Sequence, residues 1–266
     1  MPTVASRGGT SITYDQVGTG PALILVAGAL CSRLSWSGPA LADHLAAHRT
    51  VINYDRRGRG ASGDTPPYAL EREVEDIAAV LDAVGGTASL YGHSSGGALA
   101  LTTASRLGAR VDALALYEVP YNDDPSSAEA RHAYSTELAA LLAADRRGDA
   151  VALFMRTVGM PATQVEELRQ APFWAGLAAL APTLAYDQAL VMAAGGGVPR
   201  DQAARVSAPT LVMNGGAGAP FMAATARTLS DLLPQGQLRV LDGQTHDVQP
   251  EALAPVLRDF FVGAVP

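Results

Sequence analysis

The pentapeptide Gly92-His93-Ser94-Ser95-Gly96 constrains what this chain can fold into more than any other segment. It lies between a short apolar run, residues 88–91, and an alanine- and leucine-rich run, residues 97–104, so a strand should precede it and a helix should follow it. A serine with a glycine two residues away on each side, at a strand-to-helix turn, is the pattern called a nucleophile elbow. The turn exposes the serine side chain above the edge of a sheet, and the glycines avoid clashes with the adjacent strand and helix. The segment therefore predicts an α/β sheet that presents Ser94 as a nucleophile.

The second chemical group is a histidine near the carboxyl end of the chain. His246 follows a strand-like run, residues 237–241, and precedes an amphipathic helix predicted over residues 251–262. Pro250 suits the first turn of that helix, where no amide donor is needed. A serine hydroxyl is a weak nucleophile unless a base removes its proton as it attacks, and an imidazole can supply that base. We therefore expect His246 to be the general base for Ser94.

With these residues in view, the chain resembles the α/β-hydrolase family over essentially its whole length. The order of serine first and histidine last is that of the family. Three further segments match: residues 25–29 resemble the strand end that carries the oxyanion loop, residues 54–62 the loop after the next strand, and residues 209–215 the strand that usually precedes the acid. The resemblance implies an α/β-hydrolase fold: a mostly parallel, twisted sheet with helices on both faces and an inserted helical cap. It also implies hydrolysis without a cofactor.

The strand and helix pattern divides the chain into two predicted parts. Apolar strand-like runs alternate with helical runs up to about residue 119 and again after residue 201, which is typical of a parallel sheet covered on both faces. Residues 120–200 hold no strand-like run, and helices are expected there at residues 127–144, 149–158, 163–170 and 173–194. We expect an α/β core of residues 1–119 and 201–266 and a helical cap of residues 120–200. The glycines at residues 195–197 predict a hinge or turn on the return to the core.

Composition excludes several other classes of protein. With 266 residues, 48% of them apolar and 17% charged, the chain can bury the core of a globular domain. It has one cysteine, so neither an internal disulfide nor a cysteine-built metal site is expected. It has no lysine, which excludes Schiff-base and pyridoxal-phosphate chemistry. A net charge of −7 argues against nucleic acid as a partner.

Location and assembly are expectations of the same kind. The first seven residues lack the apolar core of a signal peptide, and no apolar run is long enough to span a bilayer. We therefore expect a cytoplasmic protein that does not bind membranes, acts as a monomer or homodimer, and holds no metal and no cofactor. The short basic cluster Arg56-Arg57-Gly58-Arg59 predicts a structural loop held by arginine hydrogen bonds.

The acid that should orient His246 is not at its usual place. In most relatives it follows the strand of residues 209–214 in a pattern like G-x-x-D, and the corresponding position here is Gly218. Glu118 is the predicted replacement, because it ends the strand before the cap, and open α/β sheets place active-site groups at the carboxyl ends of strands. Some family members, including haloalkane dehalogenases and zearalenone-lactone hydrolases, carry the acid after this strand. In the lactone hydrolases it is a glutamate in a similar Glu-Val-Pro setting.

Alternatives to Glu118 stay open from the sequence. Asp123 and Asp124 are interpreted as residues of the linker to the cap. Asp242 and Asp247 lie close to the histidine in sequence, which does not by itself place a carboxylate behind its ring. If Glu118 does not serve, the site is a serine–histidine dyad or takes its acid from Asp242 or the cap.

Two backbone N–H groups are expected to form an oxyanion hole. Ser95, the residue after the nucleophile, supplies one, and the resemblance assigns the other to Ala29 in the loop after residue 26. The family often has His-Gly where this chain has Ala27-Gly28, but backbone donors do not require that histidine. The side chains expected to line a substrate pocket come from this loop and from the cap: Leu30, Trp36, Tyr121, Phe154, Trp174 and Met192.

These residues together predict a serine hydrolase that cleaves a carboxylic ester or lactone through an acyl-enzyme. The apolar cap predicts a small to medium hydrophobic substrate, and the Glu-Val-Pro resemblance adds a macrolactone as one candidate. A serine nucleophile disfavours dehalogenase and epoxide-hydrolase chemistry, in which a carboxylate attacks. Carbon–carbon bond hydrolysis uses the same serine and histidine and is one alternative. A binding or receptor-like protein with weak turnover is the other, because Gly218 lacks the usual acid.

Overall fold

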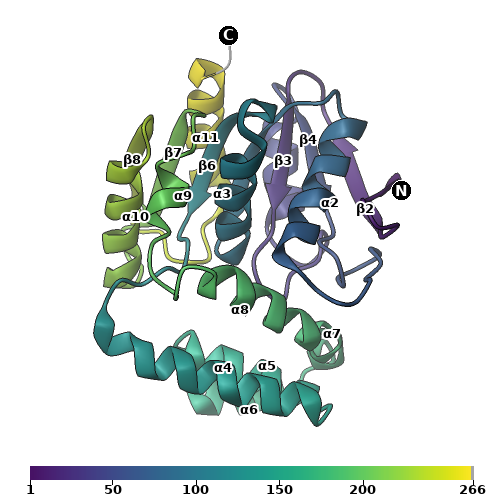
Figure 1. The fold of residues 1–266 in the computed structure, drawn as a ribbon, viewed down its shortest axis with the longest axis vertical. Coiled ribbons are helices and arrows are strands. Elements are labelled where there is room, and N and C mark those ends of the chain that lie inside the picture. The colour runs from purple at the N-terminus through teal and green to yellow at the C-terminus, as the bar shows by residue number, and fades with distance from the viewer. Residues whose placement is uncertain (265–266) are drawn as a thin grey trace.

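The computed structural model describes residues 1–264, and its centre is an eight-stranded sheet with the order β1-β2-β4-β3-β5-β6-β7-β8 (Figure 1). The strands are β1 (Thr3–Ala5), β2 (Ser11–Val17), β3 (Ala22–Val26), β4 (Thr50–Tyr54), β5 (Ala88–His93), β6 (Val111–Tyr117), β7 (Thr210–Gly215) and β8 (Gly236–Leu241). β2 pairs antiparallel with β1 and β4, and every pairing from β4 to β8 is parallel. The mostly parallel α/β sheet expected from the sequence is therefore confirmed.

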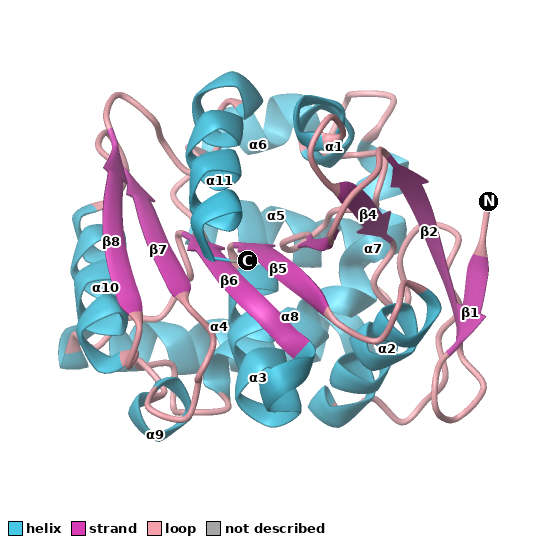
Figure 2. Ribbon diagram, turned by 90° about the horizontal axis from the view of Figure 1, so that it is seen from above, coloured by secondary structure: helices cyan, strands magenta, loops and turns pink. Residues whose placement is uncertain are grey.

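Helices cover both faces of the sheet, which explains why its inner strands are continuous apolar runs (Figure 2). α1 (Gly38–Leu45) and α11 (Pro250–Ala264) pack together on one face, in a core cluster that contains Leu41 and Leu257. α2 (Leu70–Ala83), α3 (Ser95–Leu107) and α10 (Pro220–Leu232) contribute to a larger cluster on the other face. β8 is an edge strand and is mostly exposed.

The chain changes direction across the sheet at β3. The connection through α1 leads from β3 to β4 on one side, and the connection through α2 then leads to β5 on the other side. In open α/β sheets, ligands bind beyond the carboxyl ends of strands at such a topological switch point. The carboxyl ends of β3 and β5, which carry the predicted oxyanion loop and Ser94, are the two ends that flank this point.

Between β6 and β7 the described chain forms helices and no strand. We call the following five the helical layer: α4 (Ala128–Ala143), α5 (Arg147–Thr157), α6 (Ala162–Leu168), α7 (Trp174–Leu180) and α8 (Leu184–Met192). In Figure 1 they lie below the sheet, with α8 next to it and α4 to α6 farther away. Within residues 1–264, no helix combines the length and the hydropathy needed to cross a bilayer. The assignment of residues 120–200 as a separate cap stays a prediction.

The helix expected over residues 173–194 is wrong in one respect, because it is two helices. α7 ends at Leu180, a short 3₁₀ turn covers Ala181–Thr183, and α8 begins at Leu184. Pro182 lies in that turn, and proline has no amide hydrogen to donate and disfavours the helical conformation of the preceding residue. α9 (Arg200–Ala203) and α10 are further helices that the sequence pattern did not predict.

One carboxylate joins the two connections between the sheet and the helical layer. Asp123, on the outgoing connection, accepts hydrogen bonds from the backbone N–H of Val198 and from Arg200 Nη2, both at 2.8 Å, on the returning connection. Asp124 accepts a hydrogen bond from the backbone N–H of Ser126 at 2.9 Å, at the start of the short 3₁₀ turn Pro125–Ser127 that precedes α4. Both aspartates therefore hold the connections between the sheet and the helical layer, and their assignment to a cap linker stays a prediction. The expected turn at residues 195–197 is also present, with positive φ at the first two glycines.

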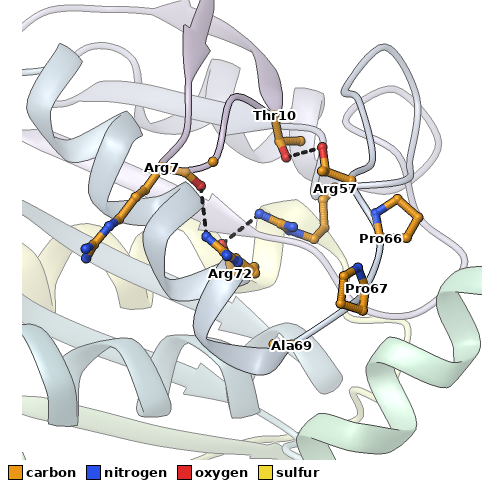
Figure 3. Close-up of a pocket in the computed structure, with 9 residues that line it drawn as sticks. Arg7, Thr10, Arg57, Pro66, Pro67, Ala69 and Arg72 are labelled. Carbon is orange, nitrogen blue, oxygen red and sulfur yellow. Dashed lines mark hydrogen bonds between the residues drawn. The ribbon is translucent and has the colours of Figure 1, made fainter.

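A surface pocket of about 160 Å³ lies where the β4–α2 connection meets the N-terminal segment (Figure 3). Its lining includes Arg57 and Arg72, but both guanidinium groups already face carboxylates. Arg57 pairs with Asp76 at 2.7 Å, and Arg72 pairs with Glu75 at 3.0 Å. Ser94 does not line this pocket, so the pocket is separate from the site described below.

The packing of α11 supports a direct test of the core. Phe261 is completely buried between α11 and the sheet, whereas the next residue, Val262, is 61% exposed. We expect Phe261→Ala to lower the free energy of unfolding by about 3–5 kcal/mol, because a large cavity forms. Val262→Ala should change it by less than about 0.5 kcal/mol, because little buried surface is lost. Urea titrations should show the midpoint shift at an unchanged slope, and equal shifts for the two variants would contradict this packing.

Candidate active site

Ser94 lies at the tight turn between β5 and α3 predicted from its glycine-flanked motif. Its backbone has φ +56° and ψ −128°, and its N–H donates a hydrogen bond of 2.9 Å to the carbonyl of Tyr117 at the end of β6. Gly96 permits this arrangement, because a Cβ there would overlap the carbonyl oxygens of Val26 and Ala27 on the neighbouring strand end. The turn thus holds Ser94 at the carboxyl edge of the sheet, where Ser94 is partly exposed.

Backbone strain is concentrated around this edge. Four non-glycine residues of the described chain have φ clearly in the positive range: Leu30, Ser94, Glu118 and Asp145. The first three follow β3, β5 and β6, which are neighbours in the sheet. Such a conformation costs about 1–3 kcal/mol per residue and persists only where the surrounding structure imposes it. Three strained residues on three adjacent strand ends mark this edge as the candidate functional site.

Glu118 turns its side chain back toward the histidine loop and is only 2% exposed. Its Oε2 lies 2.8 Å from Nδ1 of His246, and its Oε1 accepts a hydrogen bond of 3.0 Å from the backbone N–H of Gly215. Both carboxylate oxygens are therefore engaged. A Cβ added to Gly218 would overlap Oε1 of Glu118. The glycine at the usual acid position thus leaves the space in which the carboxylate of Glu118 lies.

Three hydrogen bonds hold the loop that carries His246. The hydroxyl of Tyr117 donates to the carbonyl of Thr245 at 2.6 Å, and the backbone N–H of Ala217 donates to the carbonyl of Gln244 at 2.9 Å. Nε2–H of His93 donates to the carbonyl of His246 itself at 2.9 Å. The imidazole of His246 stays accessible, with 43% of its side chain exposed. The loop therefore fixes the backbone of His246 while its ring faces the edge.

His93 has a role that sequence reasoning missed. Its ring lies between Trp36, at a centroid distance of 6.2 Å, and His246, at 4.8 Å. Burial, together with the neighbouring His246, lowers the pKa of His93 to about 4. At neutral pH His93 is therefore uncharged, and it acts as a hydrogen-bond donor to the histidine loop. No signal in the sequence distinguishes this from a side chain that merely precedes Ser94.

Within residues 1–264, no hydrogen bond joins the hydroxyl of Ser94 to the imidazole of His246. Catalytic hydrogen bonds are often long in unliganded proteins and shorten only when substrate binds. The structure thus unites the predicted base with the predicted acid, and it sets both beside the elbow through the contact of His93 with His246.

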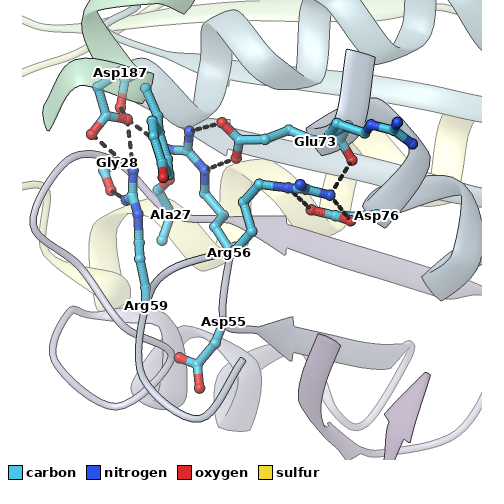
Figure 4. A network of polar contacts seen from close by, with 12 residues as sticks. Ala27, Gly28, Asp55, Arg56, Arg59, Glu73, Asp76 and Asp187 are labelled. Atoms are coloured by element: carbon cyan, nitrogen blue, oxygen red, sulfur yellow. Dashed lines mark hydrogen bonds and ion pairs between the residues drawn. The ribbon is translucent and has the colours of Figure 1, made fainter. Parts of the chain in front are cut away.

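The loop between β3 and α1 carries the predicted oxyanion donor Ala29 and is held by the basic cluster after β4 (Figure 4). Arg56 donates to the carbonyl of Ala27 at 3.2 Å, and Arg59 donates to the carbonyl of Gly28. The prediction that these arginines form a structural loop is confirmed. Ser95, the other predicted donor, is the first residue of α3 and is buried.

The residues predicted to line a substrate pocket separate into two groups. Leu30, Phe154 and Trp174 belong to one hydrophobic cluster, in which the oxyanion loop packs against α4, α5 and α7 of the helical layer. Trp36 instead lies beside His93, with its indole 3.3 Å from the side chain of Asn53. Tyr121 is 2% exposed in the larger core cluster, so it offers no surface to a substrate in this conformation. Met192 ends α8 and is partly buried.

Comparisons with known proteins agree with this geometry. The model of the alpha/beta hydrolase family matches residues 23–257. An alpha/beta hydrolase from Sphaerobacter thermophilus is 47% identical, with a TM-score of 0.87 over 98% of this chain and 100% of that chain. An esterase from Thermogutta terrifontis is 24% identical, with a TM-score of 0.72 over 100% and 99% of the two chains. An enol-lactonase from Burkholderia xenovorans is 22% identical, with a TM-score of 0.67 over 98% and 100%.

The last two similarities concern the fold alone, whereas the family match and the 47% identity concern the sequence as well. The family match spans the oxyanion loop, the elbow, Glu118 and the histidine loop. The chain belongs to the alpha/beta hydrolase family.

Proposed function

We propose that this protein hydrolyses a carboxylic ester or lactone through an acyl-enzyme, with Ser94 as nucleophile, His246 as base and Glu118 as acid. The observation that carries the proposal is the 2.8 Å contact between Glu118 Oε2 and His246 Nδ1 at the strand edge that also presents Ser94. A buried carboxylate behind one ring nitrogen keeps the proton on that nitrogen and leaves the other free to accept one.

The chemistry follows from these three groups. Ser94 Oγ attacks the carbonyl carbon of the substrate while His246 Nε2 takes its proton, and the carbonyl oxygen becomes an oxyanion. The N–H groups of Ala29 and Ser95 stabilise that oxyanion, and His246 then returns the proton to the leaving alkoxide. A water molecule then attacks the acyl-enzyme in the same way, with His246 as base, which releases the carboxylic acid product and restores Ser94. Glu118 stabilises the imidazolium that forms in each step.

The apolar side of the site favours a small to medium hydrophobic acyl or lactone group. The cluster over the oxyanion loop joins Ala29 and Leu30 to aromatic side chains of the helical layer, including Tyr134, Phe154 and Trp174. The fold neighbours described as an esterase and an enol-lactonase support the same reaction class. We propose that residues 120–200 act as a cap whose inner surface selects the substrate.

The nucleophile and base are tested together. Ser94→Ala and His246→Ala should each lower kcat for p-nitrophenyl acetate by at least about 10³-fold, because the groups act as a unit. Both variants should keep the thermal unfolding midpoint of the wild type. A fluorophosphonate should label the wild type stoichiometrically and leave Ser94→Ala unlabelled. A wild type that binds esters without turnover or labelling would instead indicate the binding protein, and an active Ser94→Ala would refute the nucleophile.

The position of the acid has its own test. Glu118→Gln should lower kcat by about 10²–10⁴-fold with little change in KM, because the neutral amide no longer holds the imidazolium. Moving the carboxylate should restore part of the rate: Glu118→Ala combined with Gly218→Asp places an acid on the strand end that usually carries it. Gly218→Asp alone should damage the enzyme, because the new side chain overlaps Glu118. A fully active Glu118→Gln would refute the assignment.

The cap proposal is tested by two phenylalanines of the helical layer. Phe154 packs in the cluster over the oxyanion loop, whereas Phe173 is 55% exposed. Phe154→Ala should lower kcat/KM for the preferred chain length by about tenfold and so change the order of kcat/KM among p-nitrophenyl esters of two to ten carbons. The reason is that loss of the ring removes contact with the acyl chain equivalent to roughly one or two methylene groups. Phe173→Ala should leave that order unchanged. Equal losses on every ester for Phe154→Ala would argue against a substrate-selecting cap.

A further inference from the structure

Four charged side chains are buried together beneath the oxyanion loop (Figure 4). Arg56 and Arg59 are each 1% exposed, Glu73 is 2% exposed, and Asp187 is 6% exposed. Arg56 makes a bidentate pair with Glu73 of α2, at 2.7 and 2.8 Å. Asp187 differs from the other three in origin, because it comes from α8 of the helical layer. A residue of that layer therefore completes a charge cluster of the α/β core.

Asp187 receives more hydrogen bonds than its neighbours. Its Oδ1 accepts from Arg56 Nη1, Arg59 Nη2 and Ser95 Oγ, each at 2.8 Å, and its Oδ2 accepts from Arg59 Nη2 at 2.8 Å. Burial raises the pKa of Asp187, but Arg59 and Arg56 outweigh that effect and hold it below its usual range. Loss of this carboxylate would leave two buried guanidinium groups without a full complement of acceptors, which is strongly unfavourable.

The arginines transmit the position of Asp187 to the oxyanion loop. Arg59 Nη1 donates to the carbonyl of Gly28, which belongs to the same peptide unit as the N–H of Ala29. A trans peptide is planar, and its C=O and N–H point in opposite directions. A guanidinium that holds the Gly28 carbonyl on one side therefore aims the Ala29 N–H to the other side. Arg56 holds the preceding carbonyl, that of Ala27, at 3.2 Å.

The second predicted oxyanion donor has the same anchor. Ser95 is 3% exposed, and its hydroxyl donates to Asp187 Oδ1 at 2.8 Å. This bond ties the first residue of α3 to the carboxylate that also holds Arg59. Ala29 and Ser95 are 66 residues apart in the sequence. Their N–H groups are nevertheless both positioned by hydrogen bonds that lead to the side chain of Asp187 on α8.

We propose that Asp187 is a positioning residue of the oxyanion hole, which sets the directions of the Ala29 and Ser95 N–H groups and links them to α8 of the helical layer. The proposal rests on the proposed function, since it assigns a role in the same acyl transfer. The aromatic stack between Tyr186, beside Asp187 on α8, and Tyr68 of the core, at 4.0 Å, holds this part of the helix in place. Asp187 touches no reacting atom and acts through Ser95 and Arg59.

The test compares two aspartate-to-asparagine changes. Asp187→Asn removes the negative charge that faces Arg59 and Ser95. Asp76→Asn is the matched control, because Asp76 is 1% exposed and makes a bidentate pair with Arg57 at 2.7 Å, away from the oxyanion loop. Both changes break a buried ion pair, so both lower stability. Only the first should change the oxyanion hole.

The readouts separate positioning from general damage. With p-nitrophenyl butyrate, and active sites counted by fluorophosphonate, Asp187→Asn should lower kcat by about 10–100-fold and change KM less than about threefold, since a single oxyanion donor contributes about 10²–10³. Ser94 Oγ adds to the carbonyl carbon of an alkyl trifluoromethyl ketone while its proton passes to His246, and the ketone oxygen becomes an oxyanion. The Ki of this ketone should rise about as much as kcat falls. The Ki of the corresponding methyl ketone, which forms little adduct, should stay within about threefold.

Ser95→Ala keeps the backbone donor and removes only its anchor, so it serves as a second variant if Asp187→Asn does not fold. It should lower kcat by about 3–10-fold and raise the Ki of the trifluoromethyl ketone by about the same factor, which is a fraction of the contribution of one oxyanion donor. Asp76→Asn should match the wild type in both. If folded Asp187→Asn and Ser95→Ala keep wild-type kcat and ketone affinity, or lose no more than Asp76→Asn, the proposal is overturned. An inactive wild type would instead refute the proposed function itself.

Discussion

Parallel pairing of β3, β5 and β6 is the constraint on which the rest of the site depends. It brings three carboxyl ends to one edge, and each end carries one part of the predicted chemistry: the oxyanion loop, Ser94 and Glu118. Each of these ends also contains a residue with positive φ, so the chain leaves the sheet by a sharp turn and not by a gradual one. Sharp turns keep the groups close together, and the packing of helices on both faces supplies the energy that maintains the strain.

The location of Glu118 places a carboxylate behind Nδ1 of His246 although the usual acid position, Gly218, has no side chain. The carboxylate reaches His246 from β6 and not from β7, and the longer side chain of glutamate spans the additional distance. Gly218 and Glu118 are complementary, since the absence of a side chain at one leaves space for the carboxylate of the other. The backbone N–H of Gly215 donates to the second carboxylate oxygen of Glu118. This hydrogen bond comes from the strand that usually supplies the acid, and it leaves neither oxygen of the buried carboxylate without a partner.

Buried ion pairs link the helical layer to the core at α8. Such pairs contribute little to net stability, because desolvation offsets much of their attraction, but removing one partner is costly. Their value here is geometric, since the arginines hold two successive carbonyl groups of the oxyanion loop. The apolar cluster of Leu30 with α4, α5 and α7 adds a second, less directional contact between layer and core.

Local sequence patterns predicted the elements and the chemical groups of this protein. The continuous apolar runs at residues 22–26 and 50–54 form β3 and β4, because strands buried on both faces require continuous apolar segments. The glycine-flanked Ser94 and the late His246 were recognisable because turn geometry and chain order follow from nearby residues. Glu118 was deduced from the place of its strand in the sheet and from a family resemblance, since no local pattern distinguishes it from a surface carboxylate.

Contacts between distant segments were decided only by the tertiary structure. Asp187 and Ser95 are 92 residues apart, and nothing in either neighbourhood indicates that one binds the other. The same holds for His93 and the carbonyl of His246, 153 residues apart, and for the burial of Tyr121 in the core. By itself, the sequence determined the mostly parallel sheet and predicted which side chains would lie at the carboxyl ends of its strands. Which donor each buried carboxylate would meet depended on how the helices packed over the strand ends, because a hydrogen bond is specified by position in space and not by separation along the chain.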